Sequence, residues 1–375
     1  MAESYKTKQT LSVRQAYELA RTRHLAGALD KAEEVYRRIL DAMPDNAETV
    51  AMMASIAFRK GEDRAGQDYL DQAIGLSRAA IQRMPQDLAM RASLVNLLLA
   101  RGRISEAEAL MTGLDIPLNP MRSTDEEFFA RRAAGIGDNL PLMVISTLPK
   151  SASESIWNQL AEGLGLAQCY LSLGLFPDCC LVPARVAEAA EGGLVTKEHI
   201  APTAHNLATL AQSGIGRVIV HHRDPRQATL SWVHFARDDI NRRLMAPLWR
   251  KIVPPAQVLE GDLSGQIDWC IENYLPLLVR FLEDWRAADA DPERPISVLF
   301  MSFERFRAEP AGYFERVLEF YDVPPERFAA EAQADVVHLR KGEIDEWRGV
   351  FTEAQRRRSW DSIPGDLAEA FGWQP

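Results

Sequence analysis

Two apolar runs, each followed by a short polar loop and a helical pattern, constrain the fold of this chain most strongly. The first run is Leu142–Thr147, and its helical pattern covers 156–164. The second is the β-branched run Arg217–His222, with a helical pattern over 226–235. Continuous apolar runs of this kind are typical of strands buried on both faces of a parallel sheet. The sequence therefore predicts an α/β fold with a parallel sheet flanked by helices.

The loop after the first run has the composition of a phosphate-binding loop. It brings Lys150 together with the hydroxyls of Ser151, Ser153 and Ser155 at the start of a helix. A helix N-terminus offers unpaired N–H groups and partial positive charge, and both favour a bound phosphate. The G-x-x-x-x-G-K-[ST] pattern does not occur here, which disfavours an ordinary ATP-hydrolysing loop.

The loop after the second run offers a second anion site. Arg223 leaves the strand, and Ser231 follows two helical turns later. Arginine can bind a phosphate through two parallel hydrogen bonds, and a serine can complete the cage, which suits a terminal phosphate monoester. By itself, an Arg-Asp-Pro sequence at a strand end is more often a turn with a solvated charge, so this segment alone is weak evidence for an anion site.

Two C-terminal segments give these loops a common interpretation. Leu339-Arg340-Lys341-Gly342 precedes Trp347, Arg348 and Phe351, an arrangement that is similar to the pattern R-K-G-x-x-G-x-W-K-x-x-F. The segment from Val298 to Phe306 matches a strand and its following turn. In this order over about 140–375, the four segments resemble those of sulfotransferases that use 3′-phosphoadenosine 5′-phosphosulfate (PAPS). The resemblance implies a sulfotransferase domain with the P-loop NTPase-like fold.

The resemblance also implies roles for individual residues. Lys150 matches the lysine that contacts the phosphosulfate and assists the leaving group, and Phe303 matches the aromatic residue near the adenine. The remaining donors around the 5′-phosphosulfate would be Ser151, Ala152, Ser153 and Glu154. The ligands of the 3′-phosphate would be Arg223, Ser231, Arg340, Lys341 and Gly342. The chain departs from the family pattern K-S-G-T-T-W at Ala152 and Glu154, and from the C-terminal signature at Asp345.

A general base is expected in the segment Thr196–Pro202, which resembles the family's K-T-H-L-P segment. Its histidine, His199, would deprotonate the acceptor, and an unperturbed histidine pKa near neutrality suits that task. Glu198 is the alternative, since some carbohydrate sulfotransferases use a glutamate. A structural alternative is that His199 caps the helix expected over 203–212.

The N-terminal third shows helical patterns throughout and resembles tetratricopeptide repeats. With Pro44 at the closing position of a repeat, small and apolar residues fall at Ala20, Ala32 and Tyr36, and the middle unit closing at Pro85 is about two turns longer. We expect a helical repeat domain over 1–116, a linker with one short helix over 117–139 and a sulfotransferase domain over 140–375. The repeats could bind a protein partner, mediate self-association, or only brace the catalytic domain.

Composition and charge limit the binding partners, the location and the metal content that can be expected for this chain. A formal net charge of −10 argues against binding to nucleic acid or anionic membranes, and no apolar run approaches the roughly 20 residues of a membrane span. The chain begins without a signal peptide's apolar stretch, so a cytoplasmic location is expected, with Cys169, Cys179, Cys180 and Cys270 as thiols. The histidines and cysteines lack metal-ligand spacing, so no metal is expected.

The sequence thus predicts a PAPS-dependent sulfotransferase that releases 3′,5′-ADP. It leaves the acceptor open among small molecules, carbohydrates and proteins, with a hydroxyl or amine as the attacking group. Two alternatives remain, a phosphotransferase on the same fold and a nucleotide-binding scaffold without turnover.

Overall fold

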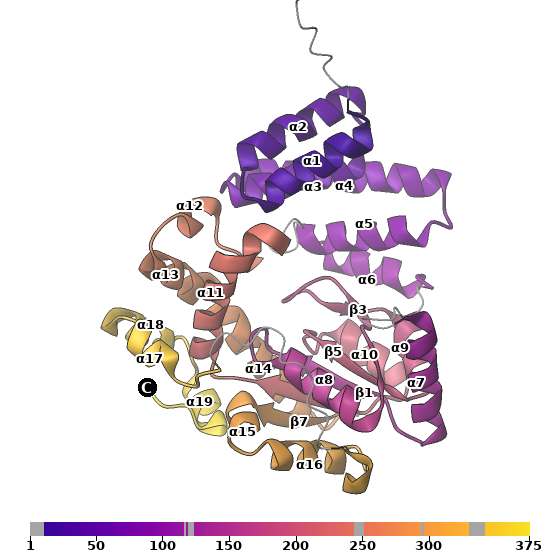
Figure 1. Ribbon diagram of the computed structural model, residues 1–375, viewed down its shortest axis with the longest axis vertical. Coiled ribbons are helices and arrows are strands. Elements are labelled where there is room, and N and C mark those ends of the chain that lie inside the picture. The colour runs from indigo at the N-terminus through magenta and orange to yellow at the C-terminus, as the bar shows by residue number, and fades with distance from the viewer. Residues whose placement is uncertain (1–10, 116–117, 119–123, 244–250, 294–295, 330–341) are drawn as a thin grey trace, which may run out of the picture.

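A computed structural model of the 375-residue chain describes residues 11–115, 118, 124–243, 251–293, 296–329 and 342–375. Helices dominate its N-terminal part, and a parallel sheet lies at the centre of the remainder (Figure 1). No described helix is both long and apolar enough to cross a membrane. The described residues also hold no cluster of histidine, cysteine and acidic side chains with the makings of a metal site.

The described part of the central sheet has five parallel strands in the order β2-β5-β1-β6-β7. Their bounds are β1 Met143–Thr147, β2 Ala167–Cys169, β5 Leu194–Glu198, β6 Arg217–His222 and β7 Ser297–Ser302. The register aligns Ile145 of β1 with Ile219 of β6. The prediction of a parallel α/β sheet is confirmed, with both predicted strands side by side at its centre. A short antiparallel pair, β3 Ser172–Leu173 and β4 Cys180–Leu181, lies apart from this sheet.

Both faces of the sheet are covered, which explains why its strands are apolar without alternation. Val144 and Val220 pack into one core cluster with α11, α13 and α14, whereas Ile145 and Ile219 pack into another with α8 and α16. Neighbouring residues of a strand point to opposite faces, so each central strand contributes to both cores. The helices of this part are α7 Asp125–Gly137, α8 Ser153–Leu164, α9 Pro183–Ala189, α10 Ala204–Gln212, α11 Pro225–Arg243, α12 Ala256–Leu259, α13 Leu263–Asn273, α14 Leu275–Ala290, α15 Phe303–Ala308, α16 Pro310–Phe320, α17 Glu346–Val350, α18 Glu353–Asp361 and α19 Gly365–Phe371, with a 3₁₀ turn at Pro325–Arg327.

The N-terminal helices pair as consecutive hairpins, α1 with α2, α3 with α4 and α5 with α6. Their bounds are α1 Val13–Leu25, α2 Leu29–Ala42, α3 Ala47–Arg59, α4 Asp63–Arg83, α5 Leu88–Arg101 and α6 Ile104–Thr112. Ala20, Ala32 and Tyr36 are fully buried, as their repeat positions predict. The middle unit is indeed longer, because α4 has 21 residues and α2 has 14.

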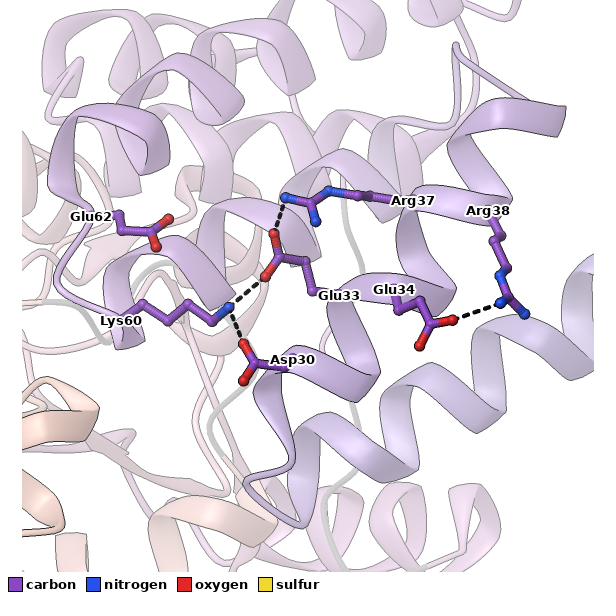
Figure 2. A pocket seen from close by; sticks show the side chains of 7 residues that line it. All are labelled: Asp30, Glu33, Glu34, Arg37, Arg38, Lys60 and Glu62. Atoms are coloured by element: carbon purple, nitrogen blue, oxygen red, sulfur yellow. Dashed lines mark hydrogen bonds and ion pairs between the residues drawn. The ribbon is translucent and has the colours of Figure 1, made fainter.

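A charged pocket of about 520 Å³ is lined by side chains of α2 and by Lys60 and Glu62, between α3 and α4 (Figure 2). Lys60 pairs with Asp30 and Glu33 at 2.5 Å each, and Arg37 pairs with the same Glu33. Each of these cations thus already has a carboxylate partner, so the pocket is a poor anion site.

The N-terminal helices pack directly on the sheet-containing part. Cys180 and Val182 share one core cluster with α5 and α6, and the Gly174 amide donates to Asn96 Oδ1 at 3.2 Å. Between these parts, α7 has 13 residues and buries Phe128 in the core beside the sheet. The predicted linker segment therefore includes a helix that is itself part of the packed structure.

We expect this shared core to make the chain unfold as one cooperative unit. Leu99 of α5 is fully buried beside Gly174, so Leu99→Ala should cost about 2–5 kcal/mol and lower the melting temperature of the whole chain. Calorimetry tests this directly. Two transitions, with only the N-terminal one shifted, would contradict it.

Candidate functional site

The predicted site residues follow four neighbouring strands of the sheet. His199 follows β5, Lys150 follows β1, Arg223 follows β6 and Phe303 follows β7. Because these strands are parallel, all four residues lie at the same edge, the carboxyl edge. Ligands of open α/β sheets bind outside this edge.

The loop after β1 has an unusual backbone. Lys150 and Ala152 have φ of 67° and 66°, in the left-handed region that non-glycine residues rarely adopt. The Ser151 hydroxyl closes the turn by donating to the Leu148 carbonyl at 2.6 Å. Side chains outside the loop hold it in this shape.

His221, which sequence analysis did not single out, is one of these supports. Its Nε2 lies 2.7 Å from the Ser151 carbonyl oxygen and its Nδ1 lies 3.0 Å from the Tyr313 hydroxyl. A carbonyl only accepts, so Nε2–H donates to it and Nδ1 accepts from Tyr313. Burial lowers the pKa of His221 to about 4, which keeps the ring neutral in this role.

The loop ends at the N-terminus of α8, where backbone donors are available. The Ala152 and Ser153 amides make no hydrogen bond to other described residues, and Ala152 provides no side-chain cap. Ser155 lies within the helix, where its hydroxyl accepts from Gln159 at 2.9 Å. The anion-binding potential therefore rests on the loop amides and the helix dipole.

Ala152→Gly should stabilise the protein, because glycine adopts the left-handed conformation without the strain of a Cβ atom. We expect a gain of about 0.5–1 kcal/mol, since the greater freedom of glycine in the unfolded chain offsets part of the relief. Urea unfolding measures it, with the exposed helical Ala79→Gly, expected to lose about 1 kcal/mol, as the control. A loss at Ala152 equal to that at Ala79 would contradict the strain.

Lys150 and Arg223 are both in contact with aromatic rings. Lys150 Nζ lies 4.3 Å from the centroid of the half-buried Phe235 ring on α11. The Arg223 guanidinium lies 4.0 Å from the centroid of Phe303, whose side chain is only 1% exposed. Phe303 therefore packs against the Arg223 guanidinium, and its expected place near the adenine stays a prediction.

Arg223 connects the loop after β1 with the C-terminal segment that begins at Gly342. It is 6% exposed, and its Nη1 donates to the Lys150 carbonyl at 3.3 Å. Its Nη2 donates to the Glu343 carbonyl, next to Gly342, which has a φ of 68°. Arg340 and Lys341 lie outside the described residues. Ser231 is half-buried, two turns along α11 from the strand end.

The segment that begins at Gly342 contacts the start of α11 through a hydrogen bond and a cation–π contact. The Trp347 amide donates to Gln227 Oε1 at 3.2 Å, and the buried Trp347 ring stacks on the Arg226 guanidinium at 4.0 Å. Arg226 in turn pairs with Asp224 at 2.7 Å. A pocket of about 540 Å³ opens on this segment, lined by Arg307, Ala308 and residues 342–346.

His199 is well placed to act as a base. Its Nδ1 lies 2.7 Å from the Thr147 carbonyl oxygen, so Nδ1–H donates and Nε2 carries the lone pair. Burial, reinforced by the charge of Lys197, lowers the pKa of the half-buried His199 to about 4. The helix over 203–212 is capped by Thr203, which accepts from the Asn206 amide, so the capping role proposed for His199 is wrong.

Glu198 is held in a structural network. Its carboxylate accepts from the Leu171 amide and the Ser172 hydroxyl, each at 2.6 Å, and from the Thr196 hydroxyl. The side chain is 2% exposed, and burial raises its pKa despite these donors. Its oxygens are therefore engaged, which favours His199 over Glu198 as the base.

Comparison with known proteins gives only distant likenesses. No family model matches the chain, and no curated protein matches it. Among solved structures, mouse sulfotransferase SULT7A1 complexed with PAP is 13% identical over 68% of this chain and 97% of its own, with a TM-score of 0.43. A Thermobaculum terrenum O-GlcNAc transferase is 12% identical over 85% of this chain and 74% of its own, with a TM-score of 0.21. Both TM-scores are below 0.5, so neither likeness supports a functional assignment.

Proposed function

We propose that this chain transfers a sulfuryl group from PAPS to a hydroxyl or amine acceptor. The observation that carries the proposal is the convergence of Lys150, Arg223 and His199 at the carboxyl edge of three adjacent parallel strands. Two cations and a neutral base on one edge suit an anionic donor and an acceptor that must lose a proton. The motif order along the chain, shared with PAPS sulfotransferases, independently supports the same reaction.

The donor would be held at both of its anionic ends. The amides of Ala152 and Ser153, with Lys150, suit the 5′-phosphosulfate, and Arg223 suits the 3′-phosphate. Arg223 contacts the backbone of the loop after β1 and of the C-terminal segment at Glu343, so it would fix the spacing of these two segments as well as neutralise charge. The resemblance adds Ser231, Arg340, Lys341 and Gly342 to the 3′-phosphate ligands in this proposal.

The reaction would be a direct displacement at sulfur. His199 Nε2 accepts the acceptor's proton as the acceptor oxygen or nitrogen forms its bond to sulfur. The bond from sulfur to the bridging phosphate oxygen breaks, and 3′,5′-ADP leaves with that electron pair. Lys150 and the loop amides would stabilise the charge on the bridging oxygen, an effect worth about 3 kcal/mol for each well-placed donor.

Transfer of sulfur-35 label from PAPS tests the proposal directly. We expect labelled product from at least one member of a panel of phenols, sugars and tyrosine peptides, in the presence of a chelator. Phosphoryl transfer from ATP with magnesium, and none from PAPS, would favour the phosphotransferase. Nucleotide binding without turnover on any acceptor would favour the scaffold.

For the N-terminal helices we propose a bracing role. This proposal is supported by the hydrophobic core that α5 and α6 share with Cys180 and Val182 beside the sheet.

A further inference from the structure

An ion pair lies against the start of α8, and no role has been assigned so far to its lysine or to its carboxylate. Glu154, in the first turn of α8, pairs with Lys197 of the neighbouring strand β5. The Lys197 side chain is 7% exposed and that of Glu154 is 25% exposed. Lys197 Nζ also lies 5.4 Å from the ring centroids of both Trp157 and Tyr170.

Glu154 creates an electrostatic problem for a nucleotide loop. A carboxylate in the first turn of a helix interacts favourably with the helix dipole, as a bound phosphate would. Here it stands beside the Ala152 and Ser153 amides that are available to an anion. Like charges at short range in a partly buried site repel strongly, so an unpaired Glu154 would oppose the donor.

Lys197 supplies the opposing charge. Burial alone would lower its pKa, but the contacts with Tyr170 and Glu154 outweigh burial and raise it. The lysine therefore stays protonated at neutral pH, and the pair is neutral as a whole. The two aromatic rings confine the ammonium at the carboxylate, since a cation is attracted to ring faces.

We propose that Lys197 is a positioning residue of the nucleotide loop, which neutralises Glu154 and keeps its carboxylate from opposing the anionic donor. The inference rests on the proposed function. It assigns Lys197 an effect that passes through Glu154, so removing the carboxylate should remove the need for the lysine.

The test is a double-mutant cycle on 3′,5′-ADP affinity, measured calorimetrically. We expect Lys197→Met to weaken binding at least about 10-fold, because it leaves the Glu154 charge uncompensated. Glu154→Gln should bind about 3-fold or more tightly than the wild type. The double variant should return to within about 3-fold of the wild type, which shows coupling between the two sites.

Two controls separate this role from a structural one. Lys197→Arg keeps the charge and should retain affinity, and the melting temperature of each variant checks folding. Lys60→Met removes a lysine with similar ion pairs in the remote pocket of Figure 2, and should leave affinity unchanged. If Lys197→Met melts too low to titrate, Lys197→Gln in the Glu154→Gln background provides the same comparison.

The outcomes distinguish a failure of the inference about Lys197 from a failure of the proposed function. A double variant as weak as Lys197→Met would overturn the inference, because Lys197 would then act on the nucleotide directly. Wild-type protein that fails to bind 3′,5′-ADP would overturn the proposed function, and the inference with it.

Discussion

Arg223→Ala is expected to weaken 3′,5′-ADP binding by at least about 100-fold, since hydrogen bonds to charged groups contribute about 1.5–3 kcal/mol each. Arg223 is the buried cation at the end of β6, and it donates to the backbone of the loop after β1 and of the C-terminal segment that begins at Gly342. The substitution would therefore remove a proposed phosphate ligand and also loosen the two segments that would bind the donor. Calorimetric titration of the wild type and the variant measures the loss.

The opposite end of the same strand offers a matched control. Arg217 opens β6 at the amino edge of the sheet, where it forms an exposed pair with Asp322 at 2.6 Å. Arg217→Ala should change nucleotide affinity by less than about 2-fold, because exposed pairs contribute little. Equal affinities of Arg223→Ala and Arg217→Ala would show that the anion site lies elsewhere.

His199→Ala should lower kcat by about 10²–10⁴-fold while 3′,5′-ADP affinity stays within about 3-fold of the wild type, as expected for loss of a general base. The Nδ1–H bond to the Thr147 carbonyl leaves Nε2 as the proton acceptor. Glu198→Gln should instead destabilise the fold, because it disturbs a carboxylate that accepts from three donors. Single-turnover rates with saturating PAPS separate the chemical step from binding.

The lowered pKa of His199 predicts how turnover changes with pH. The base works only when neutral, so activity falls as pH drops through its pKa in the folded protein. With a pKa of about 4, turnover should stay level from pH 7 to about pH 5 and fall only near pH 4. A rate that halves near pH 6.5 in the wild type would mean that an unperturbed histidine is the base. Full turnover by His199→Ala would remove the assignment altogether.

The parallel sheet, and the position of Lys150 and Arg223 at one edge of it, could be predicted because the signals for them are local. The runs at Leu142–Thr147 and Arg217–His222 are apolar on both faces, and each is followed by a cation. Parallel strands bring their carboxyl ends to one edge, so Lys150 and Arg223 had to lie near each other. His199 was proposed as the base from its motif, and it lies at the end of β5, the strand on the other side of β1.

What the sequence could not supply depends on contacts between distant segments. In the sequence, Glu154 is a departure from the family motif. The structure shows that it forms an ion pair with Lys197 of β5. Nothing in the sequence distinguishes His221 from other strand residues, although it donates a hydrogen bond to the Ser151 carbonyl and accepts one from the Tyr313 hydroxyl. The left-handed backbone conformation of Ala152 could not be predicted, because glycine is the residue whose presence in a sequence indicates that conformation.

Phe303 makes a contact that residue-by-residue transfer from a family does not predict. Its position after β7 fits the motif, but its ring lies beneath the Arg223 guanidinium at 4.0 Å. Its contribution in this structure is to support an arginine. Sequence spacing gave no sign of this, because the contact joins the ends of two neighbouring strands through side-chain packing.

The most direct test of the account is a calorimetric titration of the wild-type chain with 3′,5′-ADP and, separately, with ATP, each with and without magnesium. The convergence of Lys150, Arg223 and the α8 N-terminus predicts selective, magnesium-independent binding of 3′,5′-ADP, at least about 10-fold tighter than ATP. Magnesium-dependent preference for ATP, or no binding of 3′,5′-ADP, would contradict the account.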